Sequence, residues 1–362
     1  MVKIRVGFLA LQEPHLSPGQ RYRLEAFLPA LAQRAITVRY DWLLDRHDLR
    51  VFYGHDGVGG KALVMARAAA ARLMSVTRTR DVDVWLVQRE AFFLGGAWSE
   101  WLASLSAPIV YDFDDAIWIR ATSVANARFA WLKNVDKISR IVGLAHTVVA
   151  GNDYLATWAR SHSSHVQVVP TCVDTDVFFP PVARAVGPPV TIGWSGSAST
   201  IAHLIPLLPV LERVHARYGD AVRLRVMGDP TFTHAPLGLR GEAWSPDHEL
   251  ALLRDMEIGL MPLPDDEWTR GKCGLKGLVS MAMGAASVMS PVGVNTAIVR
   301  DGVNGFLPAS DEAWFEVLCR LVEDAGLRAR IGAAGRQTVV DDYSVTRWAP
   351  VLGDVFERAA QG

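Results

Sequence analysis

The sequence predicts an α/β protein of two doubly wound domains, each built on a parallel sheet with helices on both faces. Three observations predict this class. Short apolar runs alternate with helical apolar stripes, the alternation restarts after a proline-rich segment at 178–190, and 362 residues suffice for two domains that each bury a core. The composition, 50% hydrophobic and 21% charged, is typical of a soluble enzyme and excludes disordered and fibrous classes.

Apolar runs bounded by polar residues, glycine or proline mark the expected strands. In the first half they are KIRVGFLAL, ITVRYD, VDVWLVQ, APIVYDF, HTVVAG and HVQVVP, and in the second half VTIGWS, VRLRVMG, MEIGLMPL and ASVMS. Helical stripes with the spacing i, i+3, i+4, i+7 lie at 24–31 and 204–211. We therefore expect a first domain at 1–180, a linker at 181–190 and a second domain at 191–342.

Charge is balanced overall but unevenly distributed. The net charge is −1, yet residues 20–80 hold 11 basic and 5 acidic side chains. The balanced total excludes a protein whose main ligand is a nucleic acid. The basic segment indicates an anionic ligand or an anionic membrane face, for which Lys61, Arg67, Arg72, Arg78 and Arg80 are the candidates; a merely solvated helical surface is the alternative.

The sequence offers no sign of export, disulfides or a membrane span. The N-terminal apolar run is too short for a signal peptide, and no 18-residue apolar stretch occurs. Cys172, Cys273 and Cys319 lie too far apart for a metal knuckle and are too few for a disulfide framework. We expect a cytoplasmic protein, with peripheral contact at the inner membrane face as an option.

The loops after the first-half strands carry candidate chemistry, because ligands of doubly wound sheets bind beyond the carboxyl ends of strands. Asp112, Asp114 and Asp115 follow one strand within VYDFDDAIW. Three neighbouring carboxylates repel one another, so at least one should have a raised pKa or a cationic partner. Arg21, Arg23 or Arg89 could be that partner. Arg21 and Arg23 lie in SPGQRYR, near the expected start of a helix, where cations are unfavourable unless an anion binds there.

These aspartates suit general-base catalysis, hydroxyl binding or a divalent cation, and a helix N-cap is the structural alternative.

In the second half, Gly196 and Ser197 end a strand where backbone N–H groups can bind phosphate. Arg270, Lys272 and Lys276 crowd a glycine-containing turn before another helix, where only a strongly anionic ligand such as a diphosphate makes cations favourable. A solvated basic patch is the alternative reading.

These motifs, in this order, resemble the retaining GT-B glycosyltransferases of family 4, also called the group 1 type. The resemblance covers nearly the whole chain and is carried by SPGQRYRLEAFLPAL, VYDFDDAIW, VVPTCVDTDVF, IGWSGS, MEIGLMPLPDDEWTRGKCGLKGLVSMAMG, SPVGVN and DGVNGF. It implies two Rossmann-like domains facing across a cleft, with a C-terminal helix at 343–362 that crosses back to the first domain. It also implies that the second domain binds a nucleotide-sugar donor, that the first binds the acceptor, and that no metal or other cofactor is required.

The resemblance assigns roles to individual residues. Arg270 and Lys272 would neutralise the diphosphate, and Asp114, with Asp115 as second choice, would orient the donor sugar or the acceptor hydroxyl. The remaining donor contacts are implied for Gly19, Arg21, Gly196, Ser197, Gly228, Trp244, Lys276, Val294 and Asn295.

One departure from the family pattern affects function. Many relatives bind the donor ribose through a glutamate where this chain has Val279, which cannot accept a hydrogen bond. Asp265, Asp266 and Glu267 are the nearest carboxylates that could replace it. The leading hypothesis is retaining transfer of a sugar to a hydroxyl acceptor, such as a glycan, a lipid-linked saccharide or a metabolite. The alternatives are a catalytically weakened nucleotide-sugar-binding paralogue and a sugar-nucleotide 2-epimerase of the same fold.

Overall fold

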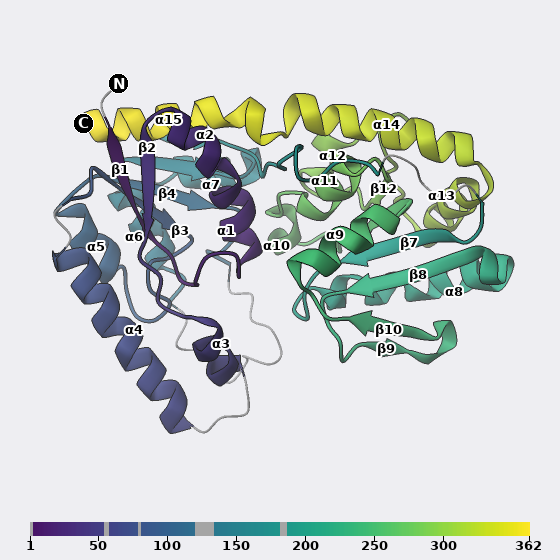
Figure 1. Ribbon diagram of the computed structural model, residues 1–362, viewed down its shortest axis with the longest axis horizontal. Helices are drawn as coiled ribbons and strands as arrows, with labels where there is room; N and C mark the ends of the chain where they lie inside the picture. Colours follow the sequence, from purple (N-terminus) through teal and green to yellow (C-terminus); the bar gives the residue numbers. More distant parts are fainter. Residues whose placement is uncertain (1–2, 54–57, 79–80, 120–133, 182–186) are drawn as a thin grey trace. The chain divides into compact units, whose positions relative to one another are not determined.

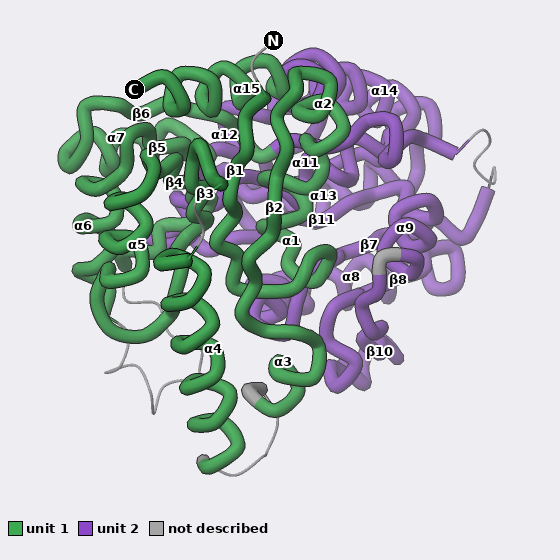
Figure 2. The backbone as a smooth tube through the Cα atoms, turned by 60° about the vertical axis from the view of Figure 1, so that its left-hand side comes forward, with its two compact units in different colours: residues 1–171, 348–362 green, residues 172–347 purple. Residues whose placement is uncertain are grey.

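The structure, a computed structural model, describes residues 3–53, 58–78, 81–119, 134–181 and 187–362. The chain divides into two compact units, coloured separately in Figure 2. Unit 1 comprises residues 1–171 and 348–362, and unit 2 comprises residues 172–347. Each unit contains one sheet with helices packed against it (Figure 1).

Unit 1 is built on a six-stranded, wholly parallel sheet. Its strands are β1 (Ile4–Leu9), β2 (Ile36–Tyr40), β3 (Val84–Gln88), β4 (Ile109–Phe113), β5 (Thr147–Ala150) and β6 (Val166–Val168). Every residue of β3 and β4 is buried, as expected for central strands of a parallel sheet covered on both faces. The helices are α1 (Pro18–Arg23), α2 (Leu28–Gln33), α3 (Arg46–Tyr53), α4 (Val58–Arg78), α5 (Trp98–Ser104), α6 (Lys137–Leu144) and α7 (Asp153–Arg160).

Unit 2 repeats this architecture with a second six-stranded sheet. Its strands are β7 (Val190–Ser195), β8 (Val222–Met227), β9 (Thr233–His234), β10 (Leu239–Glu242), β11 (Ile258–Met261) and β12 (Ala286–Met289). All its strand pairs are parallel except β9 with β10. The helices are α8 (Leu208–Tyr218), α9 (Pro246–Asp255), α10 (Glu267–Arg270), α11 (Leu275–Ala282), α12 (Asn295–Ile298), α13 (Asp311–Glu323), α14 (Ala325–Asp342) and α15 (Val345–Gln361), the last continuing into unit 1.

The strand orders place a topological switch point in each sheet. The orders are β2-β1-β3-β4-β5-β6 in unit 1 and β12-β11-β7-β8-β10-β9 in unit 2. In unit 1, β2 lies on one side of β1, and the later strands follow on the other side, starting with β3. In unit 2, β8 lies on one side of β7, and the later strands β11 and β12 lie on the other side. Ligands of open α/β sheets bind beyond the carboxyl ends of the strands at such points. The loops that follow β1, β3, β7 and β11 are therefore where each unit should bind its ligand.

The boundary between the units differs from the expected end of the first domain at residue 180. Unit 1 ends at Thr171, and residues 172–180 belong to unit 2. The reason is a backbone pairing with the chain beyond α14: Val173 N–H donates to the Tyr343 carbonyl (2.9 Å), and the Val173 carbonyl accepts from Val345 N–H (3.1 Å). The expected linker at 181–190 also falls within unit 2, with 182–186 outside the described residues and its last residue opening β7.

Helix α15, expected at 343–362, belongs to unit 1 from Trp348 onward. Arg34, just after α2, attaches it to that unit: its guanidinium donates to the Pro350 carbonyl (2.6 Å), to Asp354 (2.6 Å) and to Glu357 (3.0 Å). The opposite side of the helix supplies fully buried apolar side chains, including Phe356. Residues 348–362 are therefore an integral layer of unit 1, lying along α2 in Figure 1.

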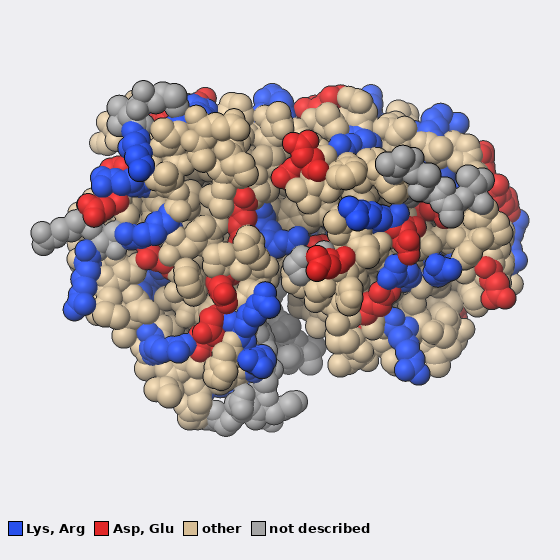
Figure 3. Space-filling model, viewed as in Figure 1, with Lys and Arg blue, Asp and Glu red and all other residues tan. Residues whose placement is uncertain are grey.

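Among the described residues, no helix combines the length and apolarity needed to cross a bilayer. In the view of Figure 3, cationic and anionic side chains are interspersed over the surface. On the face drawn there, the described residues form no broad basic patch of the kind that binds a polyanion.

Candidate functional site in the switch-point loops

In unit 1, the loops that follow β1, β3 and β4 meet at the carboxyl edge of the sheet. A methyl group at Gly19, near the start of α1, would lie 3.5 Å from Gln88 Nε2 and 3.6 Å from Asp114 Oδ2. Gly19, a predicted donor contact, and Asp114, a predicted catalytic residue, are far apart in sequence and lie close together in the structure. Arg21 lies in the same short helix, with its guanidinium carbon 5.4 Å from the centre of the Tyr22 ring.

The structure assigns cationic partners to two of the three clustered aspartates. The Arg23 guanidinium, which is almost fully buried, donates from Nε and Nη2 to Asp112 and from Nη1 to the Val169 carbonyl (2.6 Å). Arg89 Nη1 donates to Asp115 Oδ2 at 3.1 Å. Arg23 is therefore a structural cation and not an anion-binding group at a helix start. Within the described residues, none of the three aspartates caps a helix.

A small cavity of about 10 Å³ adjoins the Arg23–Asp112 pair. Gln88 and Leu86 of β3 line it together with Leu352 and Phe356 of α15. The volume is about that needed for one water molecule. It is too small for a sugar or a nucleotide.

The fold disfavours ionisation of the Asp114 carboxyl. Burial and, secondly, the charge of Asp115 raise the pKa of Asp114 above its ordinary value, while Arg89 and Arg23 oppose the rise. A raised pKa suits a group that exchanges a proton or a strong hydrogen bond with a substrate hydroxyl.

Asp114→Asn should stabilise the protein at neutral pH, because a carboxyl whose folded pKa exceeds its unfolded value costs stability wherever it is ionised. The cost is complete above the folded pKa and disappears below the unfolded value, so the gain should shrink as the pH falls to about 4. We expect a rise in Tm of roughly 1–3 °C near pH 7. Thermal melting across a pH series measures it, with Asp81→Asn on the exposed surface as the matched control. A variant less stable than the native protein at neutral pH would contradict the argument.

In unit 2, the glycines after β7 and β8 allow two backbones to approach closely. Gly228 has φ of +125°, and a Cβ there would lie 2.3 Å from the Gly196 carbonyl oxygen. The Gly196 and Ser197 amides, predicted to face a diphosphate, have partners in the structure. Gly196 N–H donates to the Met227 carbonyl (3.0 Å), and Ser197 N–H donates to Thr200 Oγ1 (2.9 Å). A ligand can replace the hydroxyl more easily than the strand carbonyl, so Ser197 is the better phosphate donor of the two.

Lys276 and Lys272 flank the start of α11 in the loop region after β11. Lys276 Nζ lies 5.4 Å from the Trp194 ring of β7, against which Gly196 also packs. Lys272 Nζ lies 5.3 Å from the Trp268 ring. Lys276 is therefore placed beside the β7 loop, at the switch point of this sheet.

Gly274 begins α11 with φ of +72°, a left-handed conformation that a side chain would strain. A Cβ at Gly274 would lie 3.4 Å from Val294 Cγ1 and 3.7 Å from Asn295 Oδ1. Asn295 is 1% exposed and donates to the Ser290 carbonyl, while its Oδ1 has no hydrogen-bond donor among the described residues. Val294 and Asn295, both predicted to contact the donor, therefore lie beside the start of α11. The buried Oδ1 of Asn295 lies close to Gly274.

Arg270 differs from the expectation that it stands ready for a diphosphate, because it binds Asp265 through Nε (2.7 Å) and Nη2 (3.2 Å). Asp266 caps α10 by accepting from Thr269 N–H (2.7 Å). Of the three carboxylates proposed to replace the missing ribose glutamate, only Glu267 has no hydrogen-bond or ion-pair partner within the described part of the chain. Val279 is buried in α11, and Trp244 lies half-buried just beyond β10 at the same sheet edge.

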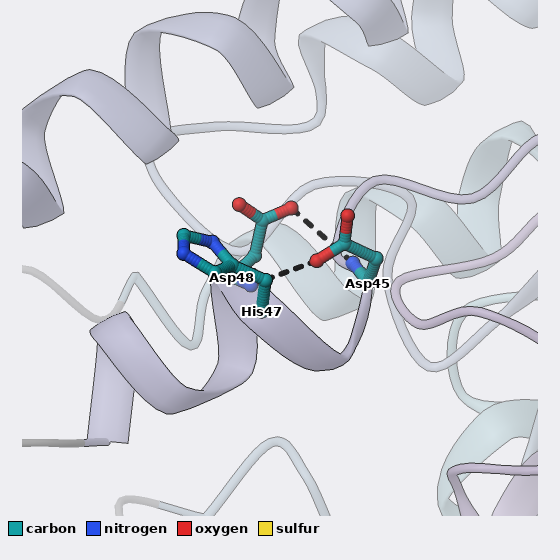
Figure 4. A group of neighbouring side chains, drawn as sticks. All are labelled: Asp45, His47 and Asp48. Carbon is teal, nitrogen blue, oxygen red and sulfur yellow. Dashed lines mark hydrogen bonds between the residues drawn. The ribbon is translucent and has the colours of Figure 1, made fainter.

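One further group resembles a metal site. Asp45, His47 and Asp48 bring ligand atoms within 4.8 Å of one another (Figure 4). The two carboxylates form a reciprocal cap at the start of α3: Asp45 Oδ1 accepts from Asp48 N–H (2.8 Å), and Asp48 Oδ2 accepts from Asp45 N–H (3.2 Å). Asp48 also binds Arg67. Helix capping accounts for this group without a metal.

The sequence reading did not identify Gln88 as part of the site, and it weighed Arg89 only as a possible cation. Gln88 ends β3 at the switch point of the sheet, and Arg89 follows it directly. Polar residues at the end of a wholly apolar run are the signal that could have identified them. Which aspartate each cation contacts depends on strand order, which the sequence does not state.

Part of the chain matches a known protein family, and its fold matches solved structures. Residues 189–324, within unit 2, match the family model described as Glycosyl transferases group 1. The match covers less than half of the chain. The matched segment includes the loops that hold Gly196, Lys272 and Asn295. A search of curated proteins finds no match to the chain.

Solved structures of similar fold cover the whole chain. Sucrose-phosphate synthase from Thermosynechococcus elongatus has a TM-score of 0.71 at 12% identity, over 98% of this chain and 99% of that chain. A glycosyltransferase from Rickettsia africae has a TM-score of 0.68 at 13% identity, over the full length of both. Anabaena HepE in complex with UDP and glucose has a TM-score of 0.67 at 13% identity, over 98% and 100%. The predicted GT-B fold, with two Rossmann-like units, is confirmed.

Proposed function

We propose that the protein is a retaining, metal-independent glycosyltransferase that moves a sugar from a nucleotide diphosphate sugar to a hydroxyl acceptor. The observation that carries the proposal is the arrangement of unit 2. Its switch-point loops place Lys276 beside the β7 loop, and Lys272 precedes the same helix start. A leaving nucleoside diphosphate needs this concentration of positive charge when no metal supplies it.

Arg270 contributes once its exposed partner is displaced. Both members of the Arg270–Asp265 pair are about half exposed, at 49% and 59%, and such pairs contribute about 0–1 kcal/mol. A diphosphate carries more charge than one carboxylate and can replace Asp265. Arg270 and Lys272 then stabilise the charge on the departing diphosphate. An oxygen of this leaving group takes the proton from the attacking hydroxyl, on the same face of the sugar from which the diphosphate departs.

The buried Asn295 Oδ1 provides a hydroxyl acceptor that Val279 cannot. An unsatisfied buried acceptor costs about 1–3 kcal/mol, and a donor hydroxyl on the ligand would remove that cost. Asn295 therefore binds a donor hydroxyl beside Gly274, with exposed Glu267 as a second oxygen ligand. In unit 1, Asp114 orients the sugar or acceptor hydroxyl.

A thermal-shift panel of UDP, GDP, dTDP, ADP and CMP tests donor binding, because a ligand at 100 times its Kd stabilises by about 2.7 kcal/mol. The matching nucleotide sugar is then incubated with acceptor extracts, and release of the nucleoside diphosphate is measured with and without EDTA. NMR of the product gives its anomeric configuration, and the same configuration as in the donor sugar would demonstrate retention. Binding without release, even with a proven acceptor, would favour the weakened binding paralogue.

We also propose that unit 1 docks on an anionic membrane through one face of α4 and α5, defined by Leu63, Leu73, Met74, Trp101 and Leu105. Each of these apolar side chains is 47–72% exposed. Helix α4 has no acidic residue, and Glu100 of α5 is buried. An apolar face on helices that expose no acidic residue of their own is complementary to anionic headgroups.

The cations of this face are fewer than the sequence suggests. Arg72 is fully buried and donates to three backbone carbonyls, and Arg67 binds Asp48. Lys61 and Arg78 remain at the surface, and Arg80 lies outside the described residues. The face therefore depends more on apolar insertion than on charge.

Leu73→Glu should reduce co-flotation with phosphatidylserine vesicles several-fold, because a carboxylate enters the apolar contact and repels the headgroups. Ile205→Glu, at a 50% exposed site of unit 2, is the matched control. Equal flotation of the native protein with neutral and anionic vesicles, or no effect of Leu73→Glu, would contradict the membrane proposal.

A further inference from the structure

Arg72 of α4 binds the backbone beyond the ends of three neighbouring strands. The residue is 0% exposed, and each of its three guanidinium nitrogens donates to a main-chain carbonyl. Nη2 donates to Ala10 (2.6 Å), Nη1 to Asp41 (2.9 Å) and Nε to Ala91 (2.8 Å). Ala10 follows β1, Asp41 follows β2, and Ala91 lies in the loop after β3. Because β2, β1 and β3 are adjacent in the sheet, one planar group joins three consecutive loops.

The apolar side of α4 contacts two of the same loops. Val64 and Ala68 precede Arg72 on the same side of the helix, at the spacing i, i+4, i+8. They belong to one buried apolar cluster with Leu43, which lies after β2, and Phe92, which lies after β3. Helix α4 is therefore the support on which these loops rest, and Arg72 provides its hydrogen bonds to them.

The choice of an arginine at this buried position follows from its donor geometry. Burial lowers the pKa of Arg72 to about 10, and the charges of Asp41 and Glu100 oppose the fall, so the side chain is protonated at neutral pH. Burying a charge is unfavourable unless its hydrogen bonds are made. The guanidinium fork directs donors to separate acceptors, whereas a lysine holds all its donors on one nitrogen and an apolar residue has none.

The loops that Arg72 joins lead to candidate site residues, and one of them is strained. The loop after β1 continues to Gly19, where a methyl group would lie 3.5 Å from Gln88 Nε2 at the end of β3. Arg89, the next residue, has φ of +63°. A non-glycine residue keeps such a conformation only where its surroundings enforce it. The arrangement of these loops therefore depends on groups that hold them from behind, among which Arg72 binds all three.

We propose that Arg72 is a positioning residue for glycosyl transfer, which holds the loops after β1, β2 and β3 in one arrangement before the substrate binds. The inference rests on the proposed function, because it states how the unit 1 part of that site is prepared. Arg72 is fully buried, so it acts through the loops. Loops that are ordered in advance need no binding energy for their ordering, and a displacement of about 1 Å can lower a rate by about 10²-fold.

Three substitutions in α4 test the proposal. Arg72→Met removes all three donated hydrogen bonds, and Arg72→Lys keeps the charge but places its donors on a single nitrogen. Val76→Ala is the matched control: Val76 lies one turn beyond Arg72 in the same helix, and it is 3% exposed. Its truncation leaves a cavity and lowers stability without removing a hydrogen bond to the loops.

Amide hydrogen exchange of the substrate-free protein is the first readout. Glu13, Leu44 and Ala91 provide one reporter in each loop, because their N–H groups donate to the Leu44 carbonyl (2.9 Å), the Leu11 carbonyl (3.0 Å) and Glu100 (2.7 Å). In Arg72→Met we expect exchange at these amides to become about tenfold faster, while Val148 of β5 stays near native.

The other variants complete the exchange measurement. Arg72→Lys should give a smaller increase at the same reporters, so it decides the question if Arg72→Met does not fold. Val76→Ala should show no increase confined to the three loops. Native exchange at the reporters in both Arg72 variants would overturn the proposal, and so would a uniform increase throughout unit 1.

Transfer kinetics are the second readout. In Arg72→Met we expect kcat to fall about 10–100-fold, whereas the Kd of the nucleoside diphosphate, assigned to unit 2, should not change. Val76→Ala should keep a native kcat although its Tm is lowered. A kcat in Arg72→Met no lower than in Val76→Ala would overturn the proposal. An absence of nucleotide binding by the native protein would instead contradict the proposed function, and the exchange measurement would still show whether Arg72 holds the loops.

Discussion

Lys272→Ala should lower the rate of glycosyl transfer by about 10²–10³-fold, because it removes a cation that stabilises charge on the departing diphosphate. Folding should change little, since the side chain is half-buried and its cation–π interaction with Trp268 contributes about 0.5–1 kcal/mol. The measurement is release of nucleoside diphosphate at saturating donor, alongside the Tm.

Two variants control this experiment. Lys272→Arg keeps the charge and should retain far more activity than Lys272→Ala. Arg254→Ala removes an exposed cation from α9 of the same unit and should leave both rate and Tm near native values. Normal turnover in Lys272→Ala would remove the diphosphate role from this residue.

Asp112→Ala should destabilise unit 1 by about 3–5 kcal/mol, because it leaves the Arg23 guanidinium buried without its counter-charge. The side chains of Arg23 and Asp112 are 2% and 9% exposed, so solvent cannot compensate. Urea unfolding monitored in the native protein and the variant measures the loss.

The double variant Arg23→Met with Asp112→Leu distinguishes an unpaired charge from general damage. Replacing both members of a buried pair by apolar side chains is often neutral, so the double variant should recover much of the lost stability. Glu312→Ala, which breaks an exposed pair with Arg213, should cost about 0–1 kcal/mol. A double variant as unstable as Asp112→Ala would show that the ion pair is not the cause.

The strands could be predicted because a parallel sheet buried on both faces requires mostly apolar runs, and VWLVQ and IVYDF each contain only one strongly polar residue. Strand β10 escaped prediction because LRGE has neither an apolar run nor an alternating pattern. The boundary at Thr171 escaped because it depends on pairing between Val173 and residues near 344, a contact that no local pattern encodes.

The residues of the candidate site were easier to predict than their interactions. Glycines and charges after strands marked Gly19, Asp114, Gly196 and Lys272 from sequence alone. The sequence predicted that Arg21, Arg23 or Arg89 pairs with the aspartate cluster, and the structure confirms this for Arg23 and Arg89. It did not predict which aspartate each cation binds, or that Arg72 donates to backbone carbonyls, because these contacts depend on strand order. A cation in a sequence can bind substrate, a carboxylate or backbone carbonyls, and only tertiary structure separates the three.

The assignment of residues 348–362 to unit 1 has a consequence for biosynthesis. Val355, Phe356 and Ala359 complete the buried interior of the unit whose other strands and helices are translated first. During synthesis, unit 1 must therefore wait, with an apolar surface uncovered, until all of unit 2 has left the ribosome. Unit 2 lacks this dependence, so the half of the chain made second is the first that can finish folding.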